Sequence, residues 1–190
     1  HDKVIATVKQ AVMIVLSVGI FTTILTLGLS GFIPMWMQVD ESILSLASTY
    51  FFVLYIPMLP RCAIIIFSAI LRAAKDSKTP MKIGILINVI NVILNYLFIY
   101  PSHSFELLGM VIPMYGADLG VVGAALASAI SFTIGGILTT IALWKNEILS
   151  PRHMQYRFEL EILKPCMKVA LPNMLQRFAT SLGYVAFASM

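Results

Sequence analysis

The sequence predicts an all-α, polytopic membrane protein, and three observations support this. Of the 190 residues, 59% are hydrophobic and only 12% are charged. The apolar residues are gathered into blocks long enough to cross a bilayer, because about 20 apolar residues in a helix span its hydrocarbon core. Lys and Arg cluster in alternate junctions between these blocks, as they do in multi-pass proteins.

Five blocks define the expected spans: 10–38, 42–71, 83–105, 119–144 and 169–190. We expect the last span to be incomplete, because the chain stops inside an apolar run. We also expect the chain to be cut from a longer one, since it opens on His1 without an initiator Met.

The charges predict an orientation. Junctions 72–82 and 145–168 carry nine Lys and Arg residues, whereas 34–42 and 101–118 carry none. By the positive-inside rule, the two basic junctions are cytoplasmic and the other two are external. The basic residues are thus orientation signals in a plasma-membrane protein, and they do not indicate a nucleic-acid site.

The first span is expected to break near Gly31 to Pro34. Its polar residues are hydroxyls, which can bond the backbone of their own helix: Ser17, Thr22, Thr23 and Thr26.

The second span begins at the acidic start signal 40–42, and its Pro57 and Pro60 predict a kink. Arg61 lies eleven residues before Arg72, roughly 16 Å deeper along a helix. Two interpretations of Arg61 stay open: a structural ion pair or carbonyl contact, and a position lining a cavity. Tyr50 is a second cavity-lining candidate.

The third span is expected to start with Thr79 as its N-cap and Pro80 at its first helical position. Asn88, Asn91 and Asn95 then fall on one helical face. Amides are costly in hydrocarbon, so this face must turn toward a neighbouring helix, a polar interior or a water-filled cavity. Helix packing and binding of an ion or substrate are both compatible with it.

The chain leaves the third span near Tyr100 and forms an outer loop to Tyr115. The fourth span then opens on small residues, many of them four apart, that allow another helix to approach closely: Gly116, Gly120, Gly123, Ala124 and Ala127. Ser128 on the same stretch can offer its hydroxyl to a neighbour.

The polar segment 146–163 alternates apolar and polar residues, so we interpret it as a cytoplasmic linker between a first unit, 1–145, and a second unit, 164–190. In the second unit, Pro172 predicts a bent helix, and Gln176 and Arg177 are cavity-lining candidates.

The sequence has no phosphate-binding Gly-rich loop, no His-Glu-x-x-His pair and no Gly-x-Ser-x-Gly elbow. It therefore supports neither an ATP-driven pump nor an intramembrane hydrolase. Scattered polarity inside helices is instead typical of a secondary transporter.

Three segments resemble the multidrug and toxic compound extrusion (MATE) transporters. Residues 69–81 read Ala-Ile-Leu-Arg-Ala-Ala-Lys-Asp-Ser-Lys-Thr-Pro-Met, similar to the Leu-Arg-x-x-Gly-Asp-x-x-Thr-Pro loop of that family. Residues 88–96 and 119–128 are similar to its fifth and sixth spans. The resemblance covers essentially the whole chain, with its motifs in the family's order.

The resemblance implies part of a twelve-helix, two-lobe transporter, from the third span to the start of the seventh. It implies export of drug-like, often cationic compounds in exchange for Na+ or H+ by alternating access. No enzyme activity, cofactor or metal beyond a possible Na+ is expected, and the protein is expected to be a monomer in the bilayer.

In some family members, residues matching Asn91, Asn95 and Ser128 take part in ion binding. Many members have Asp where this chain has Asn95, and an amide can ligate Na+ but cannot titrate. Another branch carries Glu at the position of Thr180, so the ion stays open. The alternatives are a flippase for a lipid-linked oligosaccharide or similar amphiphile, and a membrane scaffold that does not transport.

Overall fold

The computed structural model describes residues 2–37, 40–107 and 110–146, together with a few single helical positions between 164 and 180. Its elements, in chain order, are α1 (Asp2–Leu29), α2 (Phe32–Trp36), α3 (Glu41–Tyr55), α4 (Met58–Ala73), α5 (Lys78–Ile99), β1 (Pro101–Leu107), β2 (Met110–Ala117) and α6 (Gly120–Lys145).

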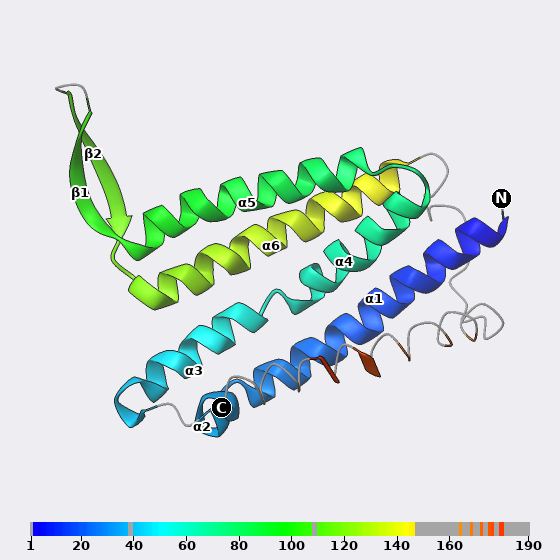
Figure 1. The fold of residues 1–190 in the computed structure, drawn as a ribbon, viewed down its shortest axis with the longest axis horizontal. Coiled ribbons are helices and arrows are strands. Elements are labelled where there is room, and N and C mark those ends of the chain that lie inside the picture. The colour runs from blue at the N-terminus through cyan, green and yellow to red at the C-terminus, as the bar shows by residue number, and fades with distance from the viewer. Residues whose placement is uncertain are drawn as a thin grey trace.

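The long helices lie side by side in the order α5, α6, α3 with α4, and α1 (Figure 1). Helix α6 contacts α3, α4 and α5, whereas α1 packs against α3 and α4. A core of buried apolar side chains joins α1, α4 and α6, and it includes Val12, Phe67 and Leu143. Large apolar side chains elsewhere point outward, as lipid-facing residues do: Phe21, Ile24, Ile65 and Val92.

Four of the five expected spans are confirmed as helices. Residues 6–29 of α1, all of α5 and all of α6 are each long and apolar enough to cross a membrane. Helices α3 and α4 pass the same test together, with a bend of 44° between them. Residues 147–163 of the predicted linker and nearly all of the fifth span lie outside the described residues.

The bend follows from covalent chemistry. Pro57 and Pro60 have no N–H, so the carbonyls of Val53 and Ile56 lack their usual helical donors. Helix α3 consequently ends at Tyr55 and α4 begins at Met58, which confirms the predicted kink. The expected break after α1 is also present, because a turn at residues 30–31 separates α1 from α2.

Two carboxylates stabilise helix starts. Asp40 accepts a hydrogen bond from the Ser42 N–H at 2.9 Å, which confirms the acidic start of the second span and lowers the pKa of Asp40. Helix α5 begins at Lys78, so the predictions of Thr79 as its N-cap and of Pro80 as its first residue are both wrong. Asp76 provides the capping oxygen instead, since it accepts from the Thr79 N–H at 3.0 Å.

The expected outer loop forms an antiparallel β-hairpin, β1–β2, that extends from one end of α5 (Figure 1). Phe105 pairs with Ile112, and the register is irregular between Pro101 and His103. These strands differ from the loop that the sequence predicted. Backbone hydrogen bonds between the two halves satisfy groups that a loop would leave to water.

Candidate functional site

Three predicted residues meet at the interface of α5 and α6. The Asn91 Nδ2 group donates to Ser128 Oγ at 3.3 Å, and the Asn95 Nδ2 group donates to Asn91 Oδ1 at 2.9 Å. Asn91 and Asn95 are neighbours because residues four apart stack on one helical face. We call Asn91, Asn95 and Ser128 the amide chain.

One acceptor of the amide chain is unused. Asn95 Oδ1 is buried and has no hydrogen-bond partner among the described residues. An unsatisfied buried polar group costs about 1–3 kcal/mol. The amide chain therefore presents an amide oxygen to which a cation or a hydrogen-bond donor can bind.

Asn88 lies apart from the amide chain. Its side chain is exposed, whereas Asn91 and Asn95 are partly buried. The predicted face of three amides is thus divided between an exposed residue and an internal pair. Helical periodicity placed the three on one side, but it did not reveal how far α6 covers that side.

The cavity-lining candidates lie in different surroundings. Tyr50 is partly buried, with its ring edge-on to Phe51 at 5.8 Å. Gln176 is exposed and helical, and Arg177 lies outside the described residues. Arg61 is partly buried, and its guanidinium carbon lies 4.2 Å from the centre of the Phe132 ring.

The predicted small residues lie in two elements and serve different purposes, since Gly116 is in β2 and the other four are in α6. A Cβ at Gly123 would collide with the Phe98 backbone, and one at Gly116 would collide with that of Tyr100. Ala127 is fully buried and Ala124 partly so. Gly120 differs, because a Cβ there would meet nothing within 4 Å. Its φ of +52° explains the glycine instead.

The closest approach of α4 and α6 was not predicted. A Cβ at Gly136 would lie 2.6 Å from Pro60 Cβ, and one at Gly135 would collide with Ile87. These glycines let α6 pack against α4 on one side and α5 on the other. The adjacent pair of glycines within an apolar span was the available signal.

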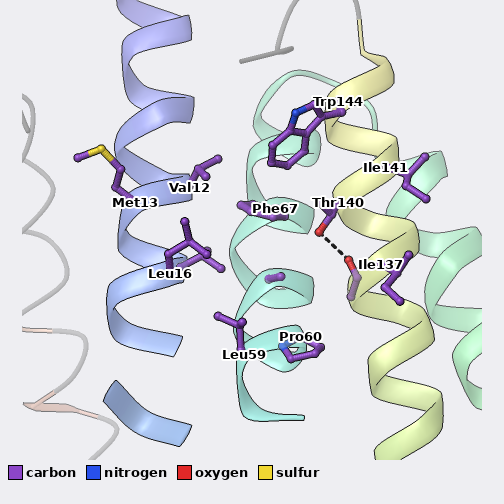
Figure 2. A pocket seen from close by; sticks show the side chains of 13 residues that line it. Val12, Met13, Leu16, Leu59, Pro60, Phe67, Ile137, Thr140, Ile141 and Trp144 are labelled. Carbon is purple, nitrogen blue, oxygen red and sulfur yellow. Dashed lines mark hydrogen bonds between the residues drawn. The ribbon is translucent and has the colours of Figure 1, made fainter. Parts of the chain in front are cut away.

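A pocket of about 670 Å³ opens between α1, α4 and α6, and it too was missed (Figure 2). Its walls are apolar and aromatic: Val12, Met13, Val15, Leu16, Leu59, Pro60, Ala63, Phe67, Gly136, Ile137, Thr140, Ile141 and Trp144. The Thr140 hydroxyl donates to the Gly136 carbonyl at 2.7 Å, as Figure 2 shows. The pocket can therefore accommodate apolar groups, but it offers little to orient a polar one.

Among the described residues, no group of three or more His, Cys, Asp or Glu side chains could hold a metal ion. The amide chain provides a different set of ligands, namely amide and hydroxyl oxygens. Such neutral oxygens suit a weakly held alkali cation better than a transition metal.

Comparison with known proteins gives consistent matches. The MatE family model matches residues 1–97, about half of the chain. A probable multidrug resistance protein NorM of Thermotoga maritima is 27% identical over 181 residues, covering 95% of this chain and 37% of that protein. Proteins with the same description from Bacillus thuringiensis and Bacillus anthracis are each 27% identical over 165 residues, covering 85% of this chain and 32% of theirs.

A solved structure has the same fold. It shows the inward-facing conformation of a multidrug resistance MATE family transporter, with a TM-score of 0.69 and 21% sequence identity. The match covers 89% of this chain and 42% of that one. The chain thus spans about a third of the length of the NorM relatives that it matches.

Proposed function

The chain belongs to the MATE family of transporters, and from that premise we propose that the whole protein exports drug-like, often cationic compounds in exchange for a cation. Its family is one of multi-pass membrane transporters and not a class of enzymes. The NorM relatives are described as probable multidrug resistance proteins, which supports export of small organic molecules.

The amide chain is the single observation that supports a specific coupling site. Asn95, Asn91 and Ser128 are linked in series inside the α5–α6 interface, and Asn95 Oδ1 remains unpartnered among the described residues. Amide oxygens can ligate Na+, but amides and hydroxyls do not titrate near neutral pH. Na+ is thus the coupling ion that these three residues favour, and a proton carrier would have to lie elsewhere.

The test uses the full-length protein and measures ethidium export from cells or vesicles driven by a Na+ gradient. Replacing Asn91 or Asn95 by Leu removes an amide and should lower export while membrane expression persists. The matched control is Asn88→Leu, which places the same substitution one turn away on an exposed position and should leave export unchanged. Normal export by both Asn91→Leu and Asn95→Leu would contradict the site.

A second candidate is flipping of a lipid-linked oligosaccharide or a similar amphiphile. It is supported by the cationic Arg61 within a membrane-crossing segment, since such a substrate carries anionic phosphate. Reconstituted vesicles distinguish the two candidates. Movement of a lipid-linked substrate without ethidium export would favour the flippase, and the reverse result would favour drug export.

A further inference from the structure

Arg61 is a charged residue within a membrane-crossing segment, and it takes no part in the amide chain. It lies in the first turn of α4, directly after the bend, and it is charged at every physiological pH. Its Nε is buried and has no hydrogen-bond partner among the described residues. Its guanidinium carbon lies 4.2 Å from the centre of the Phe132 ring.

The ring alone is a weak partner for a buried charge. Arg61 lies roughly 16 Å from Arg72 along the helix, too deep for its side chain to reach the cytoplasmic surface. Charged groups at such a depth pair with an opposite charge or line a polar cavity. A ring has no lone pair that accepts a hydrogen bond, so a cation–π contact does not satisfy the N–H donors of the guanidinium as a carboxylate would.

Within the described ranges 2–37, 40–107 and 110–146, no carboxylate lies at the depth of Arg61. The chain's nine carboxylates all lie near the chain start, at helix starts or in the junctions, and none lies within an apolar stretch: Asp2, Asp40, Glu41, Asp76, Glu106, Asp118, Glu147, Glu159 and Glu161. An oppositely charged partner for Arg61 would therefore come from outside the described residues or from a bound molecule.

The local geometry suits a carboxylate. Nε and a terminal nitrogen of a guanidinium form a planar fork that pairs with both oxygens of a carboxylate. The guanidinium carbon lies over the Phe132 ring, and Phe132 is one helical turn from Ser128 on α6. Arg61 of α4 and the amide chain thus both contact α6, at Phe132 and at Ser128.

We propose that Arg61 is a carboxylate-binding site at the bend between α3 and α4. The carboxylate belongs either to an acidic side chain of the full-length protein that lies outside the described residues, or to an acidic group on the transported compound. The second source rests on the proposed export function, whereas the first does not.

The experiment compares three probes on the full-length protein: norfloxacin, which carries a carboxylate, its methyl ester, which does not, and ethidium. Binding of each is measured by thermal shift, and export by fluorescence. Arg61→Gln removes the charge. Arg72→Gln, the same substitution at the exposed end of α4, is the matched control and should change neither measurement.

If the cargo supplies the carboxylate, the wild-type protein should bind norfloxacin about tenfold more tightly than the ester, because a bidentate charged pair is lost in the ester. Arg61→Gln should abolish that preference and leave ethidium export unchanged. If the protein supplies it, Arg61→Gln should lower the melting temperature and the export of all probes. Neutralising one particular intramembrane Asp or Glu in that background should then restore the melting temperature.

Two results would overturn the proposal. One is Arg61→Gln with wild-type melting temperature and export, combined with equal binding of norfloxacin and its ester by the wild-type protein. The other applies if the Arg61→Gln protein fails to accumulate in the membrane. In that case the proposal is overturned if neutralising no intramembrane Asp or Glu restores accumulation and if the wild-type protein binds norfloxacin and its ester equally. A wild-type protein that binds the probes but exports none of them would contradict the export function alone.

Discussion

At the scale of single residues, hydroxyls and amides behave differently inside these helices. The α1 hydroxyls donate to backbone carbonyls one turn earlier, as predicted: Ser17 to Met13 at 2.7 Å, Thr22 to Val18 at 2.8 Å, Thr23 to Gly19 at 2.6 Å and Thr26 to Thr22 at 2.7 Å. Such groups satisfy themselves and leave nothing to bind. The amides of Asn91 and Asn95 bond other side chains instead, and the bond from Asn91 to Ser128 connects α5 with α6.

The contribution of the Asn91–Ser128 hydrogen bond to the free energy of unfolding shows whether Ser128 only packs against Asn91 or also binds an ion. We expect Ser128→Ala to lower the free energy of unfolding by only about 0.6 kcal/mol, the average for a hydrogen bond between membrane helices. A double-mutant cycle with Asn91→Ala, measured by unfolding in mild detergent, should give a coupling energy of similar size.

Ser128→Ala should change the Na+ dependence of export more strongly than it changes the stability of the protein. If Ser128 contributes a ligand as well as a packing contact, Ser128→Ala should raise the Na+ concentration that gives half-maximal export. A variant that loses stability but keeps its Na+ dependence would show that the hydroxyl only joins the helices.

The sequence could predict part of this site. Helical periodicity was sufficient to bring Asn91 next to Asn95, because their contact is local. Ser128 is 37 residues away from Asn91, and it was connected with the amides through the family resemblance. The unpartnered Asn95 Oδ1 and the exposure of Asn88 depend on how two helices pack, which one sequence does not specify.

At the scale of elements, close packing of α6 against α4 depends on Gly136. We expect Gly136→Ala to destabilise the protein by about 1–3 kcal/mol, because the added Cβ would meet both the side chain and the backbone of Pro60. A proline backbone at a helix bend has little freedom to move away.

Gly84→Ala is the control for this prediction. Gly84 lies within α5, and a Cβ there would meet nothing within 4 Å. Alanine favours a helix over glycine, so this variant should be neutral or slightly more stable. Melting temperatures in detergent would show the difference, and equal losses in both variants would contradict the role of Gly136.

The start of α5 should depend on pH. Hydrogen bonds from Thr79 hold the pKa of Asp76 below its ordinary value of 3.8, so the charged form is favoured in the folded protein. This stabilisation is fully present above the ordinary pKa and is lost as the pH falls through the lower, folded value.

The wild-type protein should consequently melt at a higher temperature than Asp76→Asn at about pH 7, and this difference should shrink as the pH falls below 3.8. Asparagine keeps an oxygen that can accept from Thr79 but cannot be charged. A difference in melting temperature that persists unchanged at acid pH would show that charge is not responsible.

Helices were more predictable than their boundaries. Length and hydropathy gave the spans, and the two prolines gave the bend, since each is a property of a short stretch. The start of α5 was misplaced because Asp76 and Thr79 are both good capping residues, and the choice between them depends on the turn before the helix. The β-hairpin was missed because its strands are stabilised by pairing with each other rather than by local preference.

At the scale of the whole molecule, the charge pattern makes a prediction about sidedness. We expect the end of α4 to face the cytoplasm and the end of β2 to face the outside. Ala73 and Ala117 are both exposed alanines at these two ends, so Ala73→Cys and Ala117→Cys form a matched pair.

In a background with Cys62 and Cys166 replaced by Ser, a membrane-impermeant maleimide added to intact cells should label Ala117→Cys and not Ala73→Cys. Permeabilised cells should show labelling of both, which controls for reactivity. The opposite pattern in intact cells would reverse the predicted orientation.

Architecture at this scale was accessible from the sequence only through the family resemblance. The composition indicated a membrane protein, and the motifs indicated the family. Neither of them showed which helices pack against one another. The pocket between α1, α4 and α6 is assembled from residues as distant as Val12 and Trp144, so it exists only once those helices have packed.

The position of α6 has a consequence for how the protein is made. It contacts α3, α4 and α5, yet the ribosome delivers it after all three. Until α6 enters the bilayer, Arg61 has no Phe132 ring to cover it and Asn91 has no Ser128 to bond. We therefore expect the earlier helices to remain loosely associated near the insertion machinery during synthesis, and a chain truncated before α6 to be recognised and degraded as unassembled.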